Sequence, residues 1–402
     1  MSAPTPPLNW ARYLRWMLAT LVACVCAVGA FNVFIDPLGA FGTQRIAGVN
    51  AVKPYLDHHR ELARWQAARR LCPSAGIFGN SRAEIGFDPT HPAFAAQGLS
   101  AFNHAIPGSA ASMAVRQLDW LQTAGCAPKV ALLGVEFVDF LGSTKPGGLA
   151  PSGPAPAIDG RVLAETVFSI TGFRDAVKTL AIQRARHAAT LTERGFNPLD
   201  NYVTEVENSG HYVLFRQRAE ENRRIWNRKA RAIAPADGSP SVDQQAVDAF
   251  LEKATAGGGK AVVVIYPYHA EIRLMQARLG LAELFADWKR LIVATAARHP
   301  GVQVWDFSGI SPETLEAIPP RGDRRTQLKY YWEAGHFKKQ LGDQVIARVL
   351  GDPAANRGFG VELRPDNVEA VLAADRQRLE ALLATPSPLR DEVDDVTRAD
   401  RR

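Results

Sequence analysis

The N-terminal part of the chain contains an apolar run that is too long and too hydrophobic to stay exposed to water. Residues Trp16 to Ile35 read WMLATLVACVCAVGAFNVFI, which is about 20 residues without a charge, the length that crosses a bilayer as a helix. Arg12 and Arg15 precede this run, and the next Lys or Arg is Arg45. Because basic residues stay on the cytoplasmic side, we expect residues 1–15 in the cytoplasm and the chain after the anchor outside it.

This pattern predicts a single-pass protein of a bacterial inner membrane, with its main domain in the periplasm. Two alternatives remain open at this point. A cleaved signal peptide would use a small-residue site near Ala27 to Gly29, and a lipoprotein would be cut at LVAC, Leu21 to Cys24. The apolar sequence that continues after Cys24 favours the uncleaved anchor.

The composition of the whole chain limits the kinds of partner and ligand that we expect it to bind. With 402 residues, 47% hydrophobic and 22% charged, the chain resembles an ordinary globular protein with a large core. The net charge of +6 is spread along the chain, and no basic run alternates with aromatic residues, so we expect no nucleic-acid partner. No paired Cys/His spacing, phosphate loop or dinucleotide motif is present, so we expect no metal and no cofactor.

Apolar, β-branched runs alternate with amphipathic segments after residue 71. This alternation predicts an α/β domain with a parallel sheet that is covered on both faces. The expected strands are 75–79, 101–105, 130–135, 261–266 and 302–307, and the expected helices include 52–71, 111–124, 242–255, 271–298 and 368–384.

These segments divide the chain into expected regions. A linker and a helix occupy 36–71, and the main domain occupies 72–352 with a helical insertion at about 141–258. The insertion is too long for a structureless loop, so we interpret it as a helical cap that borders the site. The tail, 353–402, contains one helix, and its charged end from Arg390 to Arg402 is expected to be disordered.

Four short polar segments follow expected strands. They read GNSR (79–82), NHAIPGSAAS (103–112), LGVEFVDF (133–140) and YYWEAGHFKKQLGDQVI (330–346). Sites in parallel α/β sheets lie beyond the carboxyl ends of the strands, so we expect these segments to share one site. Each also has a plainer interpretation: Ser81 as a helix cap, Gly108 as a turn glycine and His336 as a surface histidine.

The spacing of Glu333 and His336 indicates a catalytic base. A carboxylate three residues before a histidine can reach the imidazole Nδ1, which leaves Nε2 free to accept a proton. A serine hydroxyl is a weak nucleophile until such a base removes its proton. The pair therefore supplies what Ser81 would need to attack an ester.

The order of these motifs resembles the SGNH (GDSL-like) hydrolase superfamily. It is most similar to membrane-anchored members associated with surface polysaccharide acetylation and teichoic-acid D-alanylation, and FGNSR and WEAGHF are the most specific parts. The resemblance covers about residues 72–352. It implies that Ser81 is the nucleophile, His336 the base and Glu333 its orienting acid, with the N–H groups of Ser81 and Gly108 in the oxyanion hole.

The chain departs from that family at two motifs. Glu333 stands where the family usually has Asp, and GVEFVDF, with Glu136 and Asp139, stands where a member supplies an Asn donor. Ionised carboxylates cannot donate hydrogen bonds, so Asn80 or Arg82 becomes the candidate replacement donor. We keep Glu136 and Asp139 as candidate substrate contacts.

His269, in YPYHAE after the fourth expected strand, is a further candidate substrate contact. It could equally well organise its loop, and no acid at a suitable spacing marks it as a base.

The cysteines outside the anchor provide a test of the fold. Cys72 precedes the first expected strand and Cys126 the third. In a three-layer sandwich with a flavodoxin-like, five-stranded sheet of order 2-1-3-4-5, these strands are neighbours. We therefore expect a Cys72–Cys126 disulfide, which a Cα–Cα distance above about 7 Å would rule out.

The sequence thus predicts an acyltransferase or esterase, with acetyl the expected group, that acts on a polysaccharide or acylated glycan. The resemblance implies a multipass membrane acyltransferase as partner. A glycan-binding or assembly protein with the same fold is the alternative, and the sequence does not choose between them.

Overall fold

The computed structural model describes residues 9–54, 58–144 and 148–398, and it divides the chain into two compact units. The first unit contains residues 1–66 and 156–190, and the second contains residues 67–155 and 191–402. The helical insertion expected at 141–258 is therefore not one body. Its part 156–190 packs with the N-terminal segment, whereas its later helices belong to the second unit.

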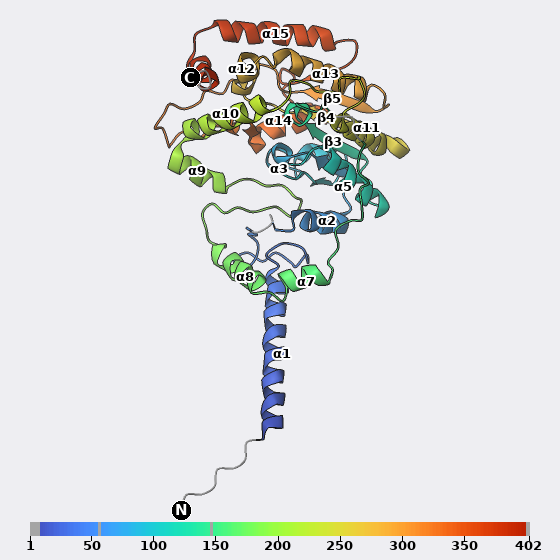
Figure 1. Ribbon diagram of the computed structural model, residues 1–402, viewed down its shortest axis with the longest axis vertical. Coiled ribbons are helices and arrows are strands. Elements are labelled where there is room, and N and C mark those ends of the chain that lie inside the picture. Colours follow the sequence, from blue (N-terminus) through green and yellow to red (C-terminus); the bar gives the residue numbers. More distant parts are fainter. Residues whose placement is uncertain (1–8, 55–57, 145–147, 399–402) are drawn as a thin grey trace, which may run out of the picture. The chain divides into compact units, whose positions relative to one another are not determined.

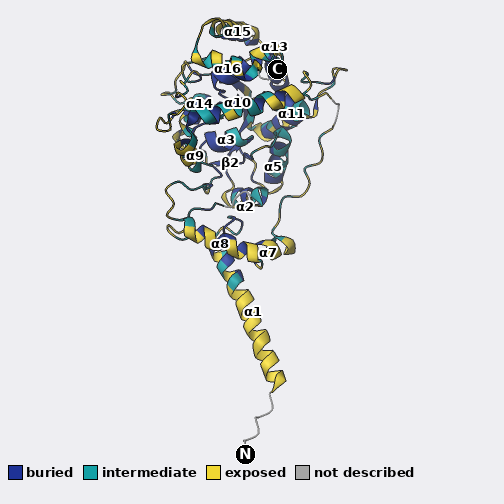
Figure 2. Ribbon diagram, turned by 60° about the vertical axis from the view of Figure 1, so that its left-hand side comes forward, coloured by how far each residue is buried: buried dark blue, intermediate teal, exposed yellow. Residues whose placement is uncertain are grey.

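The first unit contains one helix that is long and apolar enough to cross a membrane. This helix, α1 (Trp10–Ile35), begins six residues before the expected anchor, and Figure 2 shows that most of its length is exposed. Its last turns pack on α8 (Ile170–Ile182), which follows α7 (Gly160–Thr166), and Asn32 Nδ2 donates to the Val167 carbonyl at 2.8 Å. The helix α2 (Arg60–Leu71) then leads into the second unit and starts later than the expected residue 52.

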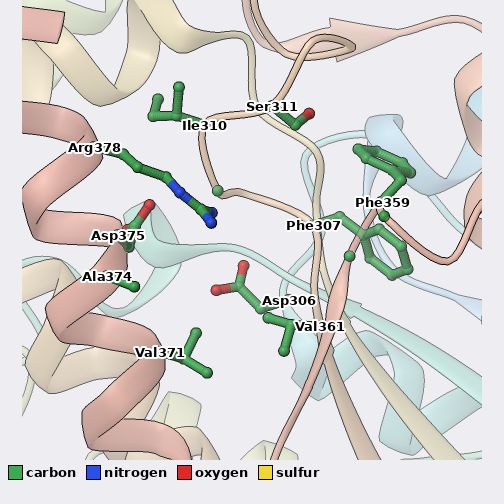
Figure 3. Close-up of a pocket in the computed structure, with 13 residues that line it drawn as sticks. Asp306, Phe307, Ile310, Ser311, Phe359, Val361, Val371, Ala374, Asp375 and Arg378 are labelled. Atoms are coloured by element: carbon green, nitrogen blue, oxygen red, sulfur yellow. The ribbon is translucent and has the colours of Figure 1, made fainter. Parts of the chain in front are cut away.

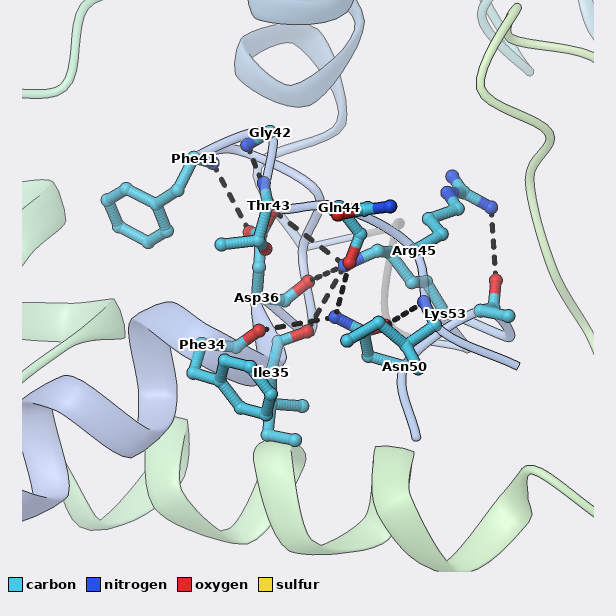
Figure 4. A network of polar contacts seen from close by, with 12 residues as sticks. Phe34, Ile35, Asp36, Phe41, Gly42, Thr43, Gln44, Arg45, Asn50 and Lys53 are labelled. Atoms are coloured by element: carbon cyan, nitrogen blue, oxygen red, sulfur yellow. Dashed lines mark hydrogen bonds and ion pairs between the residues drawn. The ribbon is translucent and has the colours of Figure 1, made fainter. Parts of the chain in front are cut away.

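A buried polar network fixes the chain where it leaves α1 (Figure 4). Asp36, 0% exposed, ends the helix and accepts the Gly42 N–H at 3.0 Å. Lys53, 2% exposed, lies 3.7 Å from the Asp36 carboxylate and donates to the Ile35 carbonyl at 3.2 Å. Buried charges persist only when they are paired and hydrogen-bonded, and this network meets both conditions at the C-terminal end of α1.

The second unit is an α/β domain built on a six-stranded, mostly parallel sheet (Figure 1). Its strand order is β2-β1-β3-β4-β5-β8, and the last pair is antiparallel. The strands are β1 (Ala75–Phe78), β2 (Ala101–Asn103), β3 (Val130–Val135), β4 (Lys260–Ile265), β5 (Val302–Asp306) and β8 (Val361–Leu363). All four residues of β1 are buried although successive side chains point to opposite faces, so both faces of the sheet are covered.

Helices pack around this sheet in two groups. The helices α5, α11 and α13 pack side by side and against β3, β4 and β5, while α3 packs on α14. The second unit contains α3 (Ser81–Gly86), α4 (Pro92–Ala96), α5 (Ala111–Thr123), α6 (Phe137–Phe140), α9 (Asn201–Ser209), α10 (His211–Arg228), α11 (Val242–Thr255), the 3-10 turn η1 (Ala256–Gly258), α12 (Ala270–Arg278), α13 (Ala282–Ala296), α14 (Lys339–Val349), α15 (Val368–Ala384) and α16 (Pro388–Arg398). A short hairpin of β6 (Tyr331–Glu333) and β7 (His336–Phe337) precedes α14.

The C-terminal tail corrects two expectations. The expected five-stranded sheet has a sixth strand, β8, because residues 361–363 pair with β5 and become the edge of the sheet. The segment expected to be disordered from Arg390 forms α16 up to Arg398. Val393 and Val396, each 1% exposed, bury its apolar face, and Arg216 on α10 pairs with Asp395 at 2.7 Å.

The expected disulfide is present. Cys72 and Cys126 are bonded, and their Cα atoms lie 5.0 Å apart, within the limit set above. The residues that follow them confirm the neighbouring strands, because Ala75 on β1 pairs with Val130 on β3. The bond therefore joins the amino ends of these two strands, opposite the carboxyl end that leads to Ser81.

Candidate functional site

Ser81 lies at a tight turn where β1 passes into α3. Gly79 makes this turn possible, because its φ is +145° and a Cβ there would lie 2.4 Å from the Tyr266 hydroxyl. Asn80 is the helix cap, and its side chain accepts the Arg82 N–H at 3.1 Å. The interpretation of Ser81 as the cap is therefore wrong, and its hydroxyl is left for another contact.

That contact is with His336. Ser81 Oγ lies 2.8 Å from His336 Nε2, although 255 positions separate the two residues in the sequence. On the other side of the ring, His336 Nδ1 is hydrogen-bonded to Glu333 Oε1. With the ring proton on Nδ1, Nε2 accepts from the serine hydroxyl, and the three side chains are linked in the order serine, histidine, carboxylate.

The β6–β7 hairpin and a close helix contact fix this geometry. Glu333 ends β6 and His336 begins β7, with the tight Ala334–Gly335 turn between them. After the hairpin, α14 approaches α3 so closely that a Cβ on Gly342 would lie 1.7 Å from the Gly86 carbonyl oxygen. The helix that begins at the serine is thereby packed against the helix that follows the histidine.

Glu333 stays ionised despite being buried. It is 1% exposed, and burial by itself raises a carboxyl pKa, but His336 lowers it by charge and hydrogen bond. Arg218, 3.1 Å away, and the Gly335 N–H, at 2.7 Å, add to this effect and bring the pKa of Glu333 to about 2. A carboxylate with this pKa is charged at neutral pH and stabilises an imidazolium at His336.

Arg218 is a site residue that the sequence did not reveal. It lies on α10, within the segment read as a helical insertion, and it also bonds Glu221 at 2.6 Å. The expectation that the insertion borders the site was the one signal that pointed toward it. Nothing in the local sequence distinguishes Arg218 from the other arginines of this helix.

The Gly108 loop lies beside the serine turn. The Ile106 N–H donates to the Gly79 carbonyl at 3.0 Å, and the Ser109 hydroxyl lies 3.3 Å from the same oxygen. Gly108 itself is exposed with φ at +73°, and a Cβ there would meet no atom within 4 Å. The loop is therefore bonded to the turn that precedes Ser81, and its Gly108 is open to solvent.

Glu136 holds both of the candidate replacement donors. Asn80 Nδ2 donates to Glu136 Oε2 at 2.6 Å, and Arg82 Nη1 pairs with the same oxygen. Arg82 keeps further N–H groups: its Nε has no hydrogen-bond partner among the described residues, and its Nη2 lies 3.1 Å from where a Gly335 Cβ would be. Arg82 is therefore the better placed of the two to donate to a substrate oxygen.

The surroundings of Asp139 favour the protonated form of its carboxyl group more than solvent does. Desolvation and the nearby Glu136 raise its pKa well above the ordinary value, against the opposing charge of Arg82. A carboxyl with a raised pKa carries a proton and can donate a hydrogen bond, which an ionised carboxylate cannot. The acidic segment after β3 therefore includes a potential donor.

His269 is not available to a substrate. Its Nδ1 accepts the Glu271 N–H at 3.2 Å as the cap of α12, and its Nε2 donates to the Glu316 carbonyl at 2.8 Å. Burial lowers the pKa of His269 to about 4, so the ring is neutral and both nitrogens are used. The loop-organising alternative is the one that its contacts support.

A separate cavity lies at the end of β5 and contains none of the predicted site residues (Figure 3). It has a volume of about 270 Å³, and Asp306, Asp375 and Arg378 point toward it. Lys289 pairs with Asp306 at 2.7 Å beneath it, and Arg273 pairs with Asp375 at 2.6 Å. The first of these buried pairs joins α13 to the end of β5, and the second joins α12 to α15.

Comparisons with models of protein families, with characterised proteins and with solved structures gave no match for this chain. The functional argument therefore rests on the geometry of the site.

Proposed function

We propose that the chain is a serine acyltransferase or esterase, anchored in a bacterial inner membrane, that acts on a periplasmic or cell-surface glycan. The observation that carries the proposal is the 2.8 Å contact between Ser81 Oγ and His336 Nε2, with Glu333 bonded to the far side of the ring. A serine, a histidine and an ionised carboxylate in this order can act as a nucleophile with its base.

The reaction follows from these positions. His336 Nε2 takes the proton of Ser81 Oγ while the oxygen adds to the acyl carbonyl carbon, and the resulting oxyanion faces the Gly108 loop and Arg82. The intermediate then expels the donor alcohol, which takes the proton from His336 and leaves an acyl-serine. A sugar hydroxyl, or water, loses its proton to His336 and attacks the carbonyl carbon of the acyl-serine. The bond to Ser81 Oγ then breaks, the acylated sugar or the free acid leaves, and Ser81 Oγ takes the proton back from His336.

The extracytoplasmic location is supported by three features. The basic residues Arg12 and Arg15 precede the apolar helix, that helix is largely exposed, and the Cys72–Cys126 disulfide belongs in an oxidising compartment. The resemblance to the SGNH superfamily adds the glycan substrate, acetyl as the acyl group and a multipass membrane acyltransferase as the donor partner. The parallel strand order β2-β1-β3-β4-β5 is what that superfamily leads one to expect.

One observation favours the alternative of a glycan-binding protein. The amide of Asn80 donates one of its two N–H groups to Glu136, so Glu136 fixes its orientation and competes with a substrate oxygen for it. In that alternative the glycan would occupy the site without an acyl-serine being formed.

Turnover of p-nitrophenyl acetate by the full chain in nanodiscs separates the two functions. The enzyme releases p-nitrophenolate, and His336→Ala abolishes the release. His299→Ala is the matched control, because His299 is similarly buried and pairs with Asp248 at 2.7 Å. Equal release from wild type and His336→Ala would contradict the enzyme proposal.

Methyl glycosides added to the same assay distinguish the two reaction types. Faster release of p-nitrophenolate, together with acetylated glycoside, identifies a transferase, whereas release that the glycosides do not change identifies an esterase. Loss of O-acetyl groups from the surface polysaccharide of cells that carry Ser81→Ala identifies the polymer.

A further inference from the structure

A second cavity, of about 370 Å³, lies between α10, α12 and α16. Its volume is within the range of about 300–1,000 Å³ typical of small-molecule sites. Neither Ser81 nor any other member of the triad lines it. The lining residues are Tyr212, Phe215, Arg216, His269, Glu271, the segment 315–321, Leu382, Ser387, Pro388, Leu389 and Glu392.

Most of this lining is apolar. Phe215 on α10, Leu382 on α15 and Leu389 on α16 contribute side chains to it, and segment 315–321 adds Ile318 and two prolines. An apolar wall of this size binds the hydrocarbon part of a ligand.

The polar group that the fold leaves unsatisfied in this wall is Glu271. The residue is 1% exposed, and neither oxygen of its carboxyl has a hydrogen-bond partner among the described residues. A buried carboxyl without partners costs several kcal/mol or takes up a proton, and burial does raise the pKa of Glu271 well above its ordinary value. The cavity thus contains an acid that can accept hydrogen bonds from a bound group.

Within the described residues, the arginine side chains near Glu271 form no ion pair with its carboxyl group. Arg216 is paired with Glu220 at 2.9 Å, and with Glu392 and Asp395 at 2.7 Å each. The Glu316 carboxyl group, in contrast to that of Glu271, accepts hydrogen bonds from the backbone N–H groups of Lys329 and Tyr330. When Glu271 is ionised, the lining contains three carboxylates, on Glu271, Glu316 and Glu392, against the guanidinium groups of Arg216 and Arg321, so negative charge is in excess.

We propose that this cavity binds an organic ammonium, with the apolar body of the ligand against the wall and its N–H groups on the Glu271 carboxylate. An ammonium offers three donors to the two free oxygens and supplies the missing positive charge. A carboxylic acid ligand would add to the excess of acid, and an alcohol of the same length would supply a donor without the charge.

The cavity wall contacts the hairpin that carries the triad. The His269 N–H donates to the Ala334 carbonyl at 3.2 Å, and the His269 ring meets the edge of Tyr331 with 5.0 Å between centroids. Ala334 lies between Glu333 and His336. The wall of the cavity is therefore in direct contact with the hairpin that carries Glu333 and His336.

Calorimetric titration of the full chain in nanodiscs with hexylammonium, hexanol and hexanoate tests the proposal. Hexylammonium should bind roughly 10- to 100-fold more tightly than hexanol, because a hydrogen bond to a charged group contributes about 1.5–3 kcal/mol. Hexanoate should not bind. Equal affinity for hexylammonium and hexanol, or binding of hexanoate, would overturn the proposal.

Four variants test whether hexylammonium binds in this cavity. Glu271→Gln should remove the preference for the ammonium, whereas Glu283→Gln, an exposed glutamate of α13, should keep it. Leu315→Trp fills the cavity from a residue that is 38% exposed, so it should abolish binding in a folded chain. Ser81→Ala should bind hexylammonium as wild type does. Unchanged ammonium binding by Leu315→Trp would place the ligand elsewhere and refute the assignment.

Discussion

Replacing Glu333 with Gln tests how the triad is held together. The carboxylate of Glu333 accepts from His336 Nδ1 and from the Gly335 N–H, and its pKa falls from an ordinary value of 4.5 to about 2. That fall corresponds to about 3 kcal/mol of interaction between the ionised carboxylate and its surroundings. A neutral amide loses this interaction and no longer stabilises the imidazolium that forms when Ser81 attacks.

The expected effect on the rate follows from this free energy. Losing about 3 kcal/mol in the transition state lowers the rate of Ser81 acylation roughly 100-fold. The assay is the burst of p-nitrophenolate from p-nitrophenyl acetate in a stopped-flow instrument. Asp248→Asn, which alters the other histidine–acid pair, should leave the burst unchanged. A burst rate of Glu333→Gln within threefold of wild type would refute the reasoning.

The same substitution changes how stability depends on pH. Because the folded-state pKa of Glu333 lies below its unfolded value, its contribution is complete above pH 4.5 and is lost as the pH falls toward 2. Urea unfolding should therefore show a free energy that falls more steeply over this range in wild type than in Glu333→Gln. Parallel pH profiles for the two proteins would contradict the depressed pKa.

Three further substitutions probe the surroundings of the site. Arg218→Ala removes a charge that helps to keep Glu333 ionised, so the acylation rate should fall while Arg224→Ala, a neighbour on α10, leaves it unchanged. Gly79→Ala places a Cβ 2.4 Å from the Tyr266 hydroxyl at a φ of +145°, so the free energy of unfolding should fall by about 3 kcal/mol, measured by urea titration. Removing the disulfide by Cys72→Ser with Cys126→Ser opens a link across 54 positions and should cost about 4 kcal/mol in the same titration. An acylation rate of Arg218→Ala equal to that of wild type, or unchanged urea midpoints for Gly79→Ala and for the double cysteine variant, would count against these assignments.

The sequence predicted the parts of the fold that depend on local pattern. β-branched runs such as 130–135 became strands, and the amphipathic segments 242–255 and 368–384 became helices with those same bounds. The disulfide followed from the strand order. Cys72 and Cys126 each precede a strand, and these two strands are neighbours, so the two cysteines lie at the same end of the sheet. Ser81 and His336 were paired by their motifs, and the structure brings the two side chains into contact.

What the sequence did not predict depends on contacts between distant segments. The charged segment from Arg390 looked disordered because its stabilising partner, Arg216, lies more than 170 positions earlier in the chain. Strand β8 is only three residues long, and its pairing with β5 has no local signal. The hydrogen bond from Asn80 to Glu136 likewise spans 56 positions, so the motif GNSR alone could not show that the Asn80 amide is bonded to a carboxylate.

Mass spectrometry of the full chain after incubation with p-nitrophenyl acetate tests the central claim most directly. We expect an acetyl group on the peptide that contains Ser81, its absence in Ser81→Ala, and its slow formation in His336→Ala. His299→Ala should be acetylated as wild type is. A chain that turns the ester over while carrying acetyl at a residue other than Ser81, or one that never becomes acetylated, would contradict the assignment of Ser81 as the nucleophile.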